Sequence, residues 1–161
     1  MVIQSIFILV MVFLMAVLVN IWEERKKYKV RMSIKESLDL VGLPVVTFSQ
    51  GDKKFNFLLD TGSNFSVVNE NALEHLEHNM TDEKGTIYGI GGEPIEANYA
   101  SLWFNYRDAN YDETFQVVDM QDSVDMIKAE SGVSIMGILG NSFFQKYEYI
   151  LDFKELVVYT Q

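Results

Sequence analysis

The chain has 161 residues, 48% of them hydrophobic, with 13 basic and 23 acidic side chains that give a net charge of −10. This length corresponds to one domain. The absence of cysteine excludes disulfides, a thiol nucleophile and cysteine-ligated metals. The negative charge argues against a nucleic-acid partner, because affinity for phosphate backbones comes from clustered Lys and Arg.

The N-terminal segment is a candidate membrane anchor. Residues 2–22 contain no ionisable side chain, and a helix of this length spans a hydrocarbon core of roughly 30 Å. Basic residues follow this run and none precedes it, which favours an uncleaved anchor over a cleaved signal peptide. Residues 23–35 carry a charge of +4 and residues 36–161 carry −14. By the positive-inside rule we predict a single-pass membrane protein with its acidic domain on the cytoplasmic side.

The remaining chain predicts short strands separated by turns. We expect residues 1–22 to form the transmembrane anchor, 23–42 a basic juxtamembrane linker running into a short strand, and 43–161 the folded domain. The predicted elements of that domain are strands at 44–48 and 54–59 around a Gln50-Gly51-Asp52 turn, a helix at 69–76 with Asn69 as N-cap, strands at 86–89, 93–102, 102–106 and 114–119, one or two helical turns at 124–129, an apolar run at 134–140, a helix at 141–146 and a hairpin at 149–159. This spacing favours an all-β, closed or partly closed barrel with one or two short helices.

One motif carries candidate chemistry. The apolar run Phe57-Leu58-Leu59 ends in Asp60-Thr61-Gly62-Ser63. Gly62 permits a turn tight enough for peptide N–H groups to face the carboxylate, and the hydroxyls of Thr61 and Ser63 can orient it. If the Ser63 hydroxyl donates to Asp60, it favours the ionised form. Ser63→Ala would then raise the acidic limb of the pH–rate profile.

Two further motifs accompany the first one. A glycine-rich hairpin, Tyr88-Gly89-Ile90-Gly91-Gly92, lies in the middle of the domain, and the apolar run Ile138-Leu139-Gly140 precedes the predicted helix at 141–146. Together, and in this order, the three motifs resemble the retropepsin-like aspartic proteases, single-domain relatives of pepsin. The resemblance covers about residues 43 to 160.

The resemblance implies a role for each matching position. Asp60 is the catalytic residue, Thr61 braces the two active-site loops against each other, and Gly62 and Ser63 complete the catalytic loop. Ile138, Leu139 and Gly140 support that loop from behind. The hairpin is a flap over the substrate, with Gly89, Gly91 and Gly92 at its tip and Tyr88 and Ile90 as candidate substrate contacts.

The chain contains a single Asp-Thr-Gly sequence. Asp152 follows a similar apolar pair, but Phe153-Lys154 come after it, and we interpret it as a solvated strand residue. Because aspartic protease chemistry needs two carboxyls that share a proton, one chain supplies half of a site. We therefore predict a homodimer with Asp60 of each subunit at the two-fold axis, acting on peptide or protein substrates. Water is the nucleophile, and neither a cofactor nor a metal is implied.

The sequence disfavours three alternatives. The main rival is a membrane-tethered peptide-binding module that keeps the fold without catalysis; an intact Asp60-Thr61-Gly62 disfavours it. A phosphate-binding loop at Gly89–Gly92 is disfavoured because no Lys and no helix pattern follow. His75 and His78 could share a helix face, but no further ligands lie at useful spacing for a metal.

Overall fold

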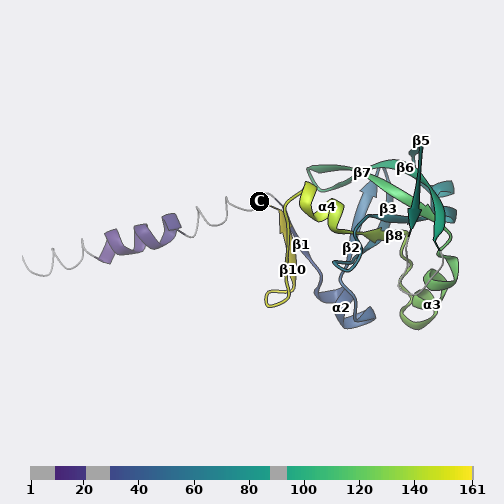
Figure 1. The fold of residues 1–161 in the computed structure, drawn as a ribbon. Coiled ribbons are helices and arrows are strands. Elements are labelled where there is room, and N and C mark those ends of the chain that lie inside the picture. Colours follow the sequence, from purple (N-terminus) through teal and green to yellow (C-terminus); the bar gives the residue numbers. More distant parts are fainter. Residues whose placement is uncertain (1–9, 21–29, 88–93, 161) are drawn as a thin grey trace, which may run out of the picture.

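The computed structural model describes residues 10–20, 30–87 and 94–160. Residues 10–20 are helical, and residues 30–160 form the folded domain apart from the undescribed segment 88–93 (Figure 1). Among the residues so described, no helix is long and apolar enough to cross a membrane.

Seven strands form the main sheet of the domain, in the order β2-β3-β8-β4-β7-β6-β5. Their bounds are β2 Val45–Gln50, β3 Lys53–Leu59, β4 Val67–Asn69, β5 His78–Ile87, β6 Ile95–Tyr106, β7 Ala109–Val118 and β8 Gly137–Leu139. Strand β2 also pairs with β6 through Ser49 and Asn105. This contact closes six of the strands into a ring, which confirms the predicted all-β barrel.

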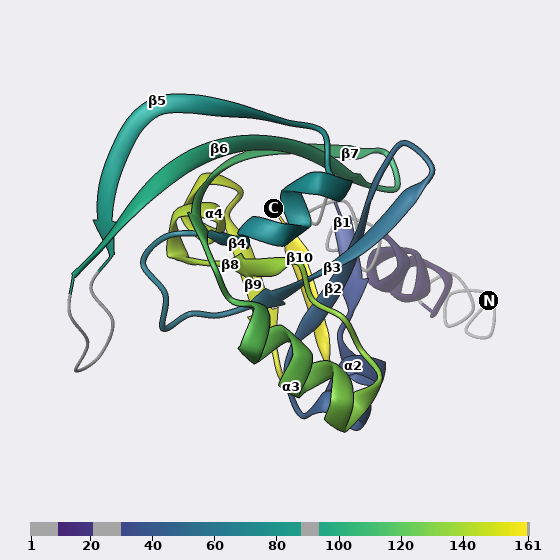
Figure 2. The same ribbon diagram turned by 90° about the vertical axis from the view of Figure 1, so that its right-hand side faces the viewer.

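The β2–β3 hairpin agrees with the sequence prediction, whereas the strands predicted at 93–102 and 102–106 do not. The β2–β3 hairpin forms where expected, with Gly51 at a φ of 60° in its turn. The strands expected at 93–102 and 102–106 are one strand, β6, because Ala100, Leu102 and Phe104 continue a single alternation of buried side chains. Strands β5 and β6 run side by side and curve over the rest of the barrel (Figure 2).

A second sheet of three antiparallel strands lies beside the barrel, in the order β1-β10-β9. It contains β1 (Val30–Ser33), β10 (Val157–Thr160) and β9 (Tyr149–Asp152). The boundary expected at residue 43 is therefore wrong, since the folded unit already begins at Val30. Met32 and Ile34 are buried in the main core at 1% and 0% exposure, and β1 pairs with β10 along its full length.

The described residues contain more helix than expected. The helices of the folded domain are α2 (Lys35–Val41), a 3₁₀ helix at Glu70–His75, α3 (Gln121–Ser131) and α4 (Asn141–Lys146). Helix α4 matches its predicted bounds. Asn69 occupies the N-cap position of the 3₁₀ helix, as predicted, but its side chain makes no capping bond: its Oδ1 accepts the backbone N–H of Met120 at 3.0 Å and its Nδ2 donates to Gln121. The Asn69 side chain therefore holds the segment before α3 and does not cap the helix that follows it.

The core of the barrel is built from aromatic rings. Its largest fully buried side chains are Phe48, Phe57, Phe104, Phe115 and Phe143. Phe57 stacks on Phe115 with ring centroids 5.2 Å apart, and Phe48 meets Phe104 edge-on at 4.9 Å. Each such ring contributes about 1.5–3 kcal/mol through burial. Since Phe57 lies three residues before Asp60, this packed core fixes the strand from which the Asp60-Thr61-Gly62 motif emerges.

Candidate active site

Asp60 immediately follows β3, and its backbone is held on both sides. Its N–H donates to the carbonyl oxygen of Leu139 at 3.0 Å, and its own carbonyl accepts the N–H of Ser63 at 3.2 Å. The carboxylate oxygen Oδ1 accepts the N–H of Gly62 at 2.8 Å. A peptide N–H that donates to a carboxylate makes a charge-assisted bond stronger than a neutral one. The side chain is half-buried, so a fixed carboxylate remains accessible at the end of the strand.

The segment Ile138, Leu139 and Gly140 lies directly against the Asp60 loop, as the sequence predicts. Strand β8 is parallel to β3, with Leu139 beside Leu59, and antiparallel to β4, with Ile138 beside Val67. It is thus inserted between the strand that precedes Asp60 and the strand that follows it. Leu139 is fully buried, so the contact is a packed one.

Gly140 approaches the loop too closely for any other residue. A Cβ at this position would lie 2.4 Å from the carbonyl oxygen of Phe65 and 2.9 Å from that of Ser63. Both obstacles are backbone atoms, which cannot rotate away as a side chain could. The glycine is therefore required for close packing of the two loops.

Thr61 and Ser63 differ from each other in their contacts. The Thr61 side chain is exposed and makes no hydrogen bond within the described part of the chain. The Ser63 hydroxyl donates to the carbonyl oxygen of Phe65 at 2.7 Å. The predicted bond from Ser63 to the Asp60 carboxylate is therefore wrong. The turn brings the Phe65 carbonyl within reach of the hydroxyl, which stabilises the loop itself.

Sequence reasoning missed a set of polar residues behind the loop. The Nδ2 of Asn141 donates to the carbonyl oxygen of Thr61 at 3.0 Å, and its backbone N–H donates to the carbonyl oxygen of Ser63 at 2.9 Å. Behind these contacts, the hydroxyls of Ser66 and Ser142 both donate to the buried carboxyl of Glu113, at 2.9 and 2.8 Å. The alternation of Tyr111, Glu113 and Phe115 along β7 could have placed Glu113 on the inner face.

The environment of Glu113 is unusual for a charged residue. Its side chain is only 5% exposed. Burial raises the pKa of Glu113 above its ordinary value, while the bonds from Ser142 and Ser66 and the charge of Lys146 oppose this shift. The nearby Asp112 carboxylate raises the Glu113 pKa further. A buried carboxyl of this kind persists only where hydrogen bonds satisfy it.

The other predicted residues are placed as follows. Tyr88, Gly89, Ile90, Gly91 and Gly92, the expected flap, lie outside the described residues. His75 ends the 3₁₀ helix and His78 begins β5, so the predicted common helix face is wrong. Across the described ranges, no group of three or more His, Cys, Asp or Glu side chains is arranged to hold a metal ion.

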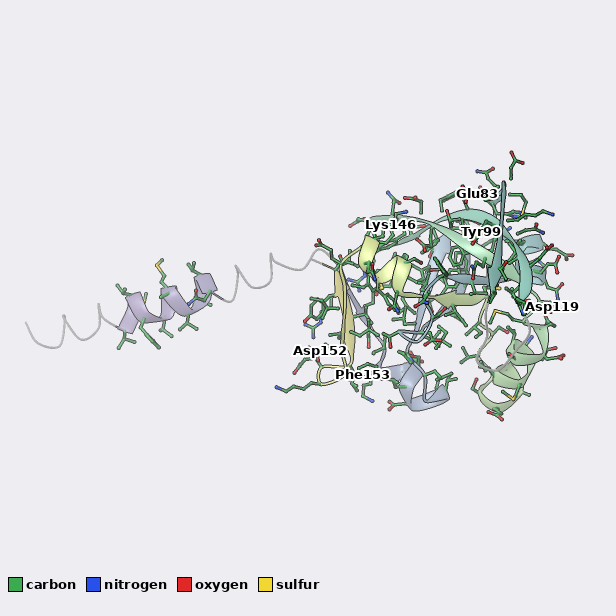
Figure 3. The ribbon with its side chains drawn as sticks, viewed as in Figure 1. Glu83, Tyr99, Asp119, Lys146, Asp152 and Phe153 are labelled. Atoms are coloured by element: carbon green, nitrogen blue, oxygen red, sulfur yellow. The ribbon has the colours of Figure 1, made fainter. Side chains whose placement is uncertain are left out.

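Asp152 is the last residue of β9, which agrees with its interpretation as a strand residue, and it precedes the turn to β10 (Figure 3). Its Oδ1 accepts the backbone N–H groups of Lys154 and Glu155, both at 2.9 Å. Such bonds are typical of an aspartate that stabilises its own turn. Asp152 therefore ends a strand, and its carboxylate stabilises the turn that follows.

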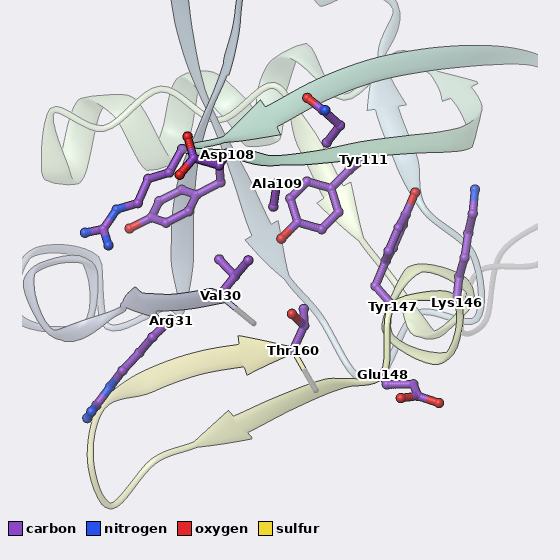
Figure 4. Close-up of a pocket in the computed structure, with 12 residues that line it drawn as sticks. Val30, Arg31, Asp108, Ala109, Tyr111, Lys146, Tyr147, Glu148 and Thr160 are labelled. Carbon is purple, nitrogen blue, oxygen red and sulfur yellow. The ribbon is translucent and has the colours of Figure 1, made fainter. Parts of the chain in front are cut away.

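A cavity of the folded domain lies away from Asp60. It has a volume of about 740 Å³ and lies between β1, β10, the β6–β7 turn and the end of α4, with Tyr106, Tyr111 and Tyr147 among its lining residues (Figure 4). A second, shallower cavity is lined by residues of the 3₁₀ helix and of β5, β6 and β7. Neither one includes Asp60.

Comparison with known proteins agrees with the geometry of the loop. A family model described as aspartyl protease matches residues 46–143, well over half of the chain, from β2 through the Asp60 loop to α4. No curated protein sequence matches the chain significantly. The family match confirms the resemblance seen in the three sequence motifs. The chain belongs to the aspartyl protease family.

Proposed function

We propose that the protein is a membrane-anchored, homodimeric aspartic endopeptidase in which each subunit supplies one catalytic carboxyl, that of Asp60. The observation that carries this proposal is the setting of Asp60. Backbone hydrogen bonds with Leu139 and Ser63 fix its main chain. The N–H of Gly62 orients one carboxylate oxygen, and the carboxylate stays accessible. A catalytic group needs this combination of fixed geometry and access to substrate.

A second subunit would complete the site. The exposed Thr61 side chain, which has no hydrogen-bond partner among the described residues, is available for a contact across a two-fold axis. With Asp60 of each subunit at the axis, the substrate groove would lie between the two subunits. In that groove, Tyr88 and the glycines 89, 91 and 92 would cover the substrate together with Ile90.

The proposed chemistry follows from two carboxyls at close range. Two like charges about 3 Å apart do not both ionise, so the pair shares one proton. The ionised Asp60 accepts a proton from water, whose oxygen attacks the scissile carbonyl carbon while the protonated Asp60 donates to the carbonyl oxygen. The Asp60 that took the proton from water then passes it to the leaving nitrogen, while the other Asp60 takes a proton back from a hydroxyl of the tetrahedral intermediate, and the C–N bond breaks to give the carboxyl product. These steps regenerate the starting pair without a covalent enzyme intermediate.

The membrane anchor is supported by the apolar character of residues 2–22. Within them, residues 10–20 are helical, and nine large apolar side chains there are 38–68% exposed. Such a surface is unfavourable in water. Confinement of both subunits to one membrane would raise their effective concentration and favour the dimer. Added protease should digest the acidic domain only after intact cells are permeabilised, if that domain is cytoplasmic.

The deciding experiment is Asp60→Asn in the full-length chain, assayed against a peptide library. This change is nearly isosteric and removes the shared proton, so peptide-bond hydrolysis should vanish. Hydrolysis that survives the change would exclude the proposed mechanism. Peptide binding without turnover in the unmodified protein would instead identify a binding module of the same fold.

Mixed subunits test the dimer separately. If both Asp60 carboxyls are needed, an equal mixture of exchanged wild-type and Asp60→Asn subunits should keep about one quarter of the activity, because only dimers of two intact subunits work. A mixture with Asp122→Asn, an exposed position on α3, should keep full activity. Activity of one half in the Asp60 mixture would show that each subunit works alone.

A further inference from the structure

The buried carboxyl of Glu113 lies behind the Asp60 loop and outside the three motifs that define the site. It occupies the inner face of β7 between Tyr111 and Phe115, and its residue is only 5% exposed. Burial of an ionisable group is unfavourable unless hydrogen bonds satisfy it. A fold that needed only packing here would be served equally well by an apolar residue. A carboxyl at this position therefore indicates a role beyond packing.

The hydroxyl protons around Glu113 all have a defined direction. Ser66 Oγ donates to Glu113 Oε1 at 2.9 Å, and Ser142 Oγ donates to the same oxygen at 2.8 Å. A serine hydroxyl has a single proton, so Ser66 then presents only lone pairs to its other neighbours. One of these lone pairs accepts the backbone N–H of Gly140 at 3.2 Å. Glu113 thus sets the orientation in which Ser66 can bind Gly140.

These bonds lead directly to the catalytic residue. Gly140 follows Leu139, whose carbonyl oxygen accepts the N–H of Asp60 at 3.0 Å. Ser66 itself ends the loop that begins at Asp60, and its carbonyl accepts the N–H of Gln116 from β7 at 2.9 Å. Glu113 therefore joins, through one oxygen, the end of the Asp60 loop and the loop that supports it.

We propose that Glu113 is a positioning residue for the reaction, acting as the acceptor that orients Ser66 toward Gly140 and so fixes the peptide on which Asp60 rests. This role rests on the proposed catalytic function of Asp60. What Glu113 supplies is an acceptor oxygen at the Oε1 position. A neutral carboxamide can provide the same oxygen, whereas an apolar side chain cannot.

Three variants of the full-length chain test this role. Glu113→Leu removes the acceptor at similar volume, and kcat should fall by about 10- to 100-fold with little change in KM, because the loop rather than the substrate groove is displaced. Glu113→Gln should recover most of that loss. Ser66→Ala should lower kcat to a similar extent, and the Glu113→Leu/Ser66→Ala double variant should be no worse than either single one, because both act through one bond.

A matched control separates positioning from loss of stability. Ile34 is fully buried and lies outside both loops, so Ile34→Val or Ile34→Ala, chosen for an equal fall in unfolding midpoint, should keep kcat per folded dimer. The proposal is overturned if folded, dimeric Glu113→Leu keeps wild-type kcat, if the Ile34 control loses as much, or if Glu113→Gln is as impaired as Glu113→Leu.

A readout without turnover distinguishes this proposal from the proposed function. Hydrogen exchange of the Gly140 and Asp60 amides should be at least about 10-fold faster in Glu113→Leu than in Ile34→Val, because local opening no longer breaks an oriented bond. Faster exchange in a chain that hydrolyses no peptide would support the network while refuting the protease. Unchanged exchange would overturn the role of Glu113 whatever the activity.

Discussion

Asn141 holds Thr61 at the centre of the Asp60 loop: its side-chain Nδ2 donates to the Thr61 carbonyl oxygen at 3.0 Å. The backbone N–H of the same residue donates to Ser63 at 2.9 Å. Asn141 is also the first residue of α4, which packs through the fully buried Phe143 into the aromatic core. A single residue thus connects the Asp60 loop to the rigid centre of the domain.

The first prediction concerns this side chain. Asn141→Ala removes the bond to Thr61 but keeps the backbone bond to Ser63, so stability should fall by only about 1 kcal/mol. kcat should fall by about 10-fold or more, because a small displacement of a catalytic group has a large effect on rate. Asn141→Asp should be worse, since it places a carboxylate oxygen against the carbonyl. Steady-state kinetics and urea unfolding measure both effects.

The control for this prediction is Asn71→Ala. Asn71 makes a comparable amide bond, to Gln121 at 3.0 Å, but on the exposed side of the 3₁₀ helix. Its loss should leave kcat unchanged. Equal rates for Asn141→Ala and the wild-type protein would show that the contact with Thr61 has no part in catalysis.

A second prediction follows from the close packing of Gly140. Gly140→Ala forces a methyl group against the carbonyls of Phe65 and Ser63, so stability should fall by about 1–3 kcal/mol or more. Activity per folded molecule should fall with it, because the displaced atoms belong to the Asp60 loop. Gly132→Ala, with open space around it but a φ of 76°, should lose about 1–2 kcal/mol and keep its activity when folded. Similar activities for the two variants would contradict this account.

The third prediction uses the observed contact of Ser63. Its hydroxyl is bound to the Phe65 carbonyl, so Ser63→Ala should leave the acidic limb of the pH–rate profile where it is. The expected loss is about 1 kcal/mol of stability, from one missing hydrogen bond. A pH series of kcat/KM for the two proteins checks this. A shifted acidic limb would indicate that the hydroxyl turns to the carboxylate in the working enzyme.

The fourth prediction concerns the pH dependence of stability. Burial raises the pKa of Glu113 in the folded protein, with Asp112 acting in the same direction and Ser142, Ser66 and Lys146 against it. A group whose folded pKa is raised contributes stability below its unfolded pKa, ordinarily about 4.5, and loses that contribution as pH rises through the folded value. Glu113→Gln does not titrate, so its stability relative to wild type should increase from about pH 4.5 upward and then level off.

Urea unfolding of both proteins between pH 4 and pH 8 measures this difference, and all other titrating groups cancel in the comparison. A stability difference that does not change with pH, or one that favours the wild-type protein increasingly as pH rises, would show that the folded state does not disfavour ionised Glu113.

Local patterns were sufficient for some of the structure. The β2–β3 hairpin and α4 depend on alternation, a turn glycine and helix spacing, which are all visible within a few residues. The placement of Ile138, Leu139 and Gly140 against the Asp60 loop came from the family resemblance. The apolar run by itself indicates a strand, which β8 is, but it does not indicate where that strand lies.

What the sequence did not reveal depends on long-range partners. Strand β1 lies in a charged stretch and becomes a strand only by pairing with β10, far away in the sequence. Asn69 has the residue type and position of an N-cap, but a distant backbone N–H, that of Met120, takes its oxygen. The alternation along β7 places Glu113 on the inner face, but the hydroxyls that satisfy its carboxyl come from Ser66 and Ser142, far away in the sequence.

The pairing of β1 with β10 also determines when the domain can be finished during synthesis. Val30 pairs with Thr160, so strand β1 has no partner until strand β10 has left the ribosome. Contacts between residues so distant in sequence form late in folding. Until then Met32 and Ile34, which end up fully buried, stay exposed on a nascent chain. A newly made subunit would therefore need protection from aggregation until β10 is available.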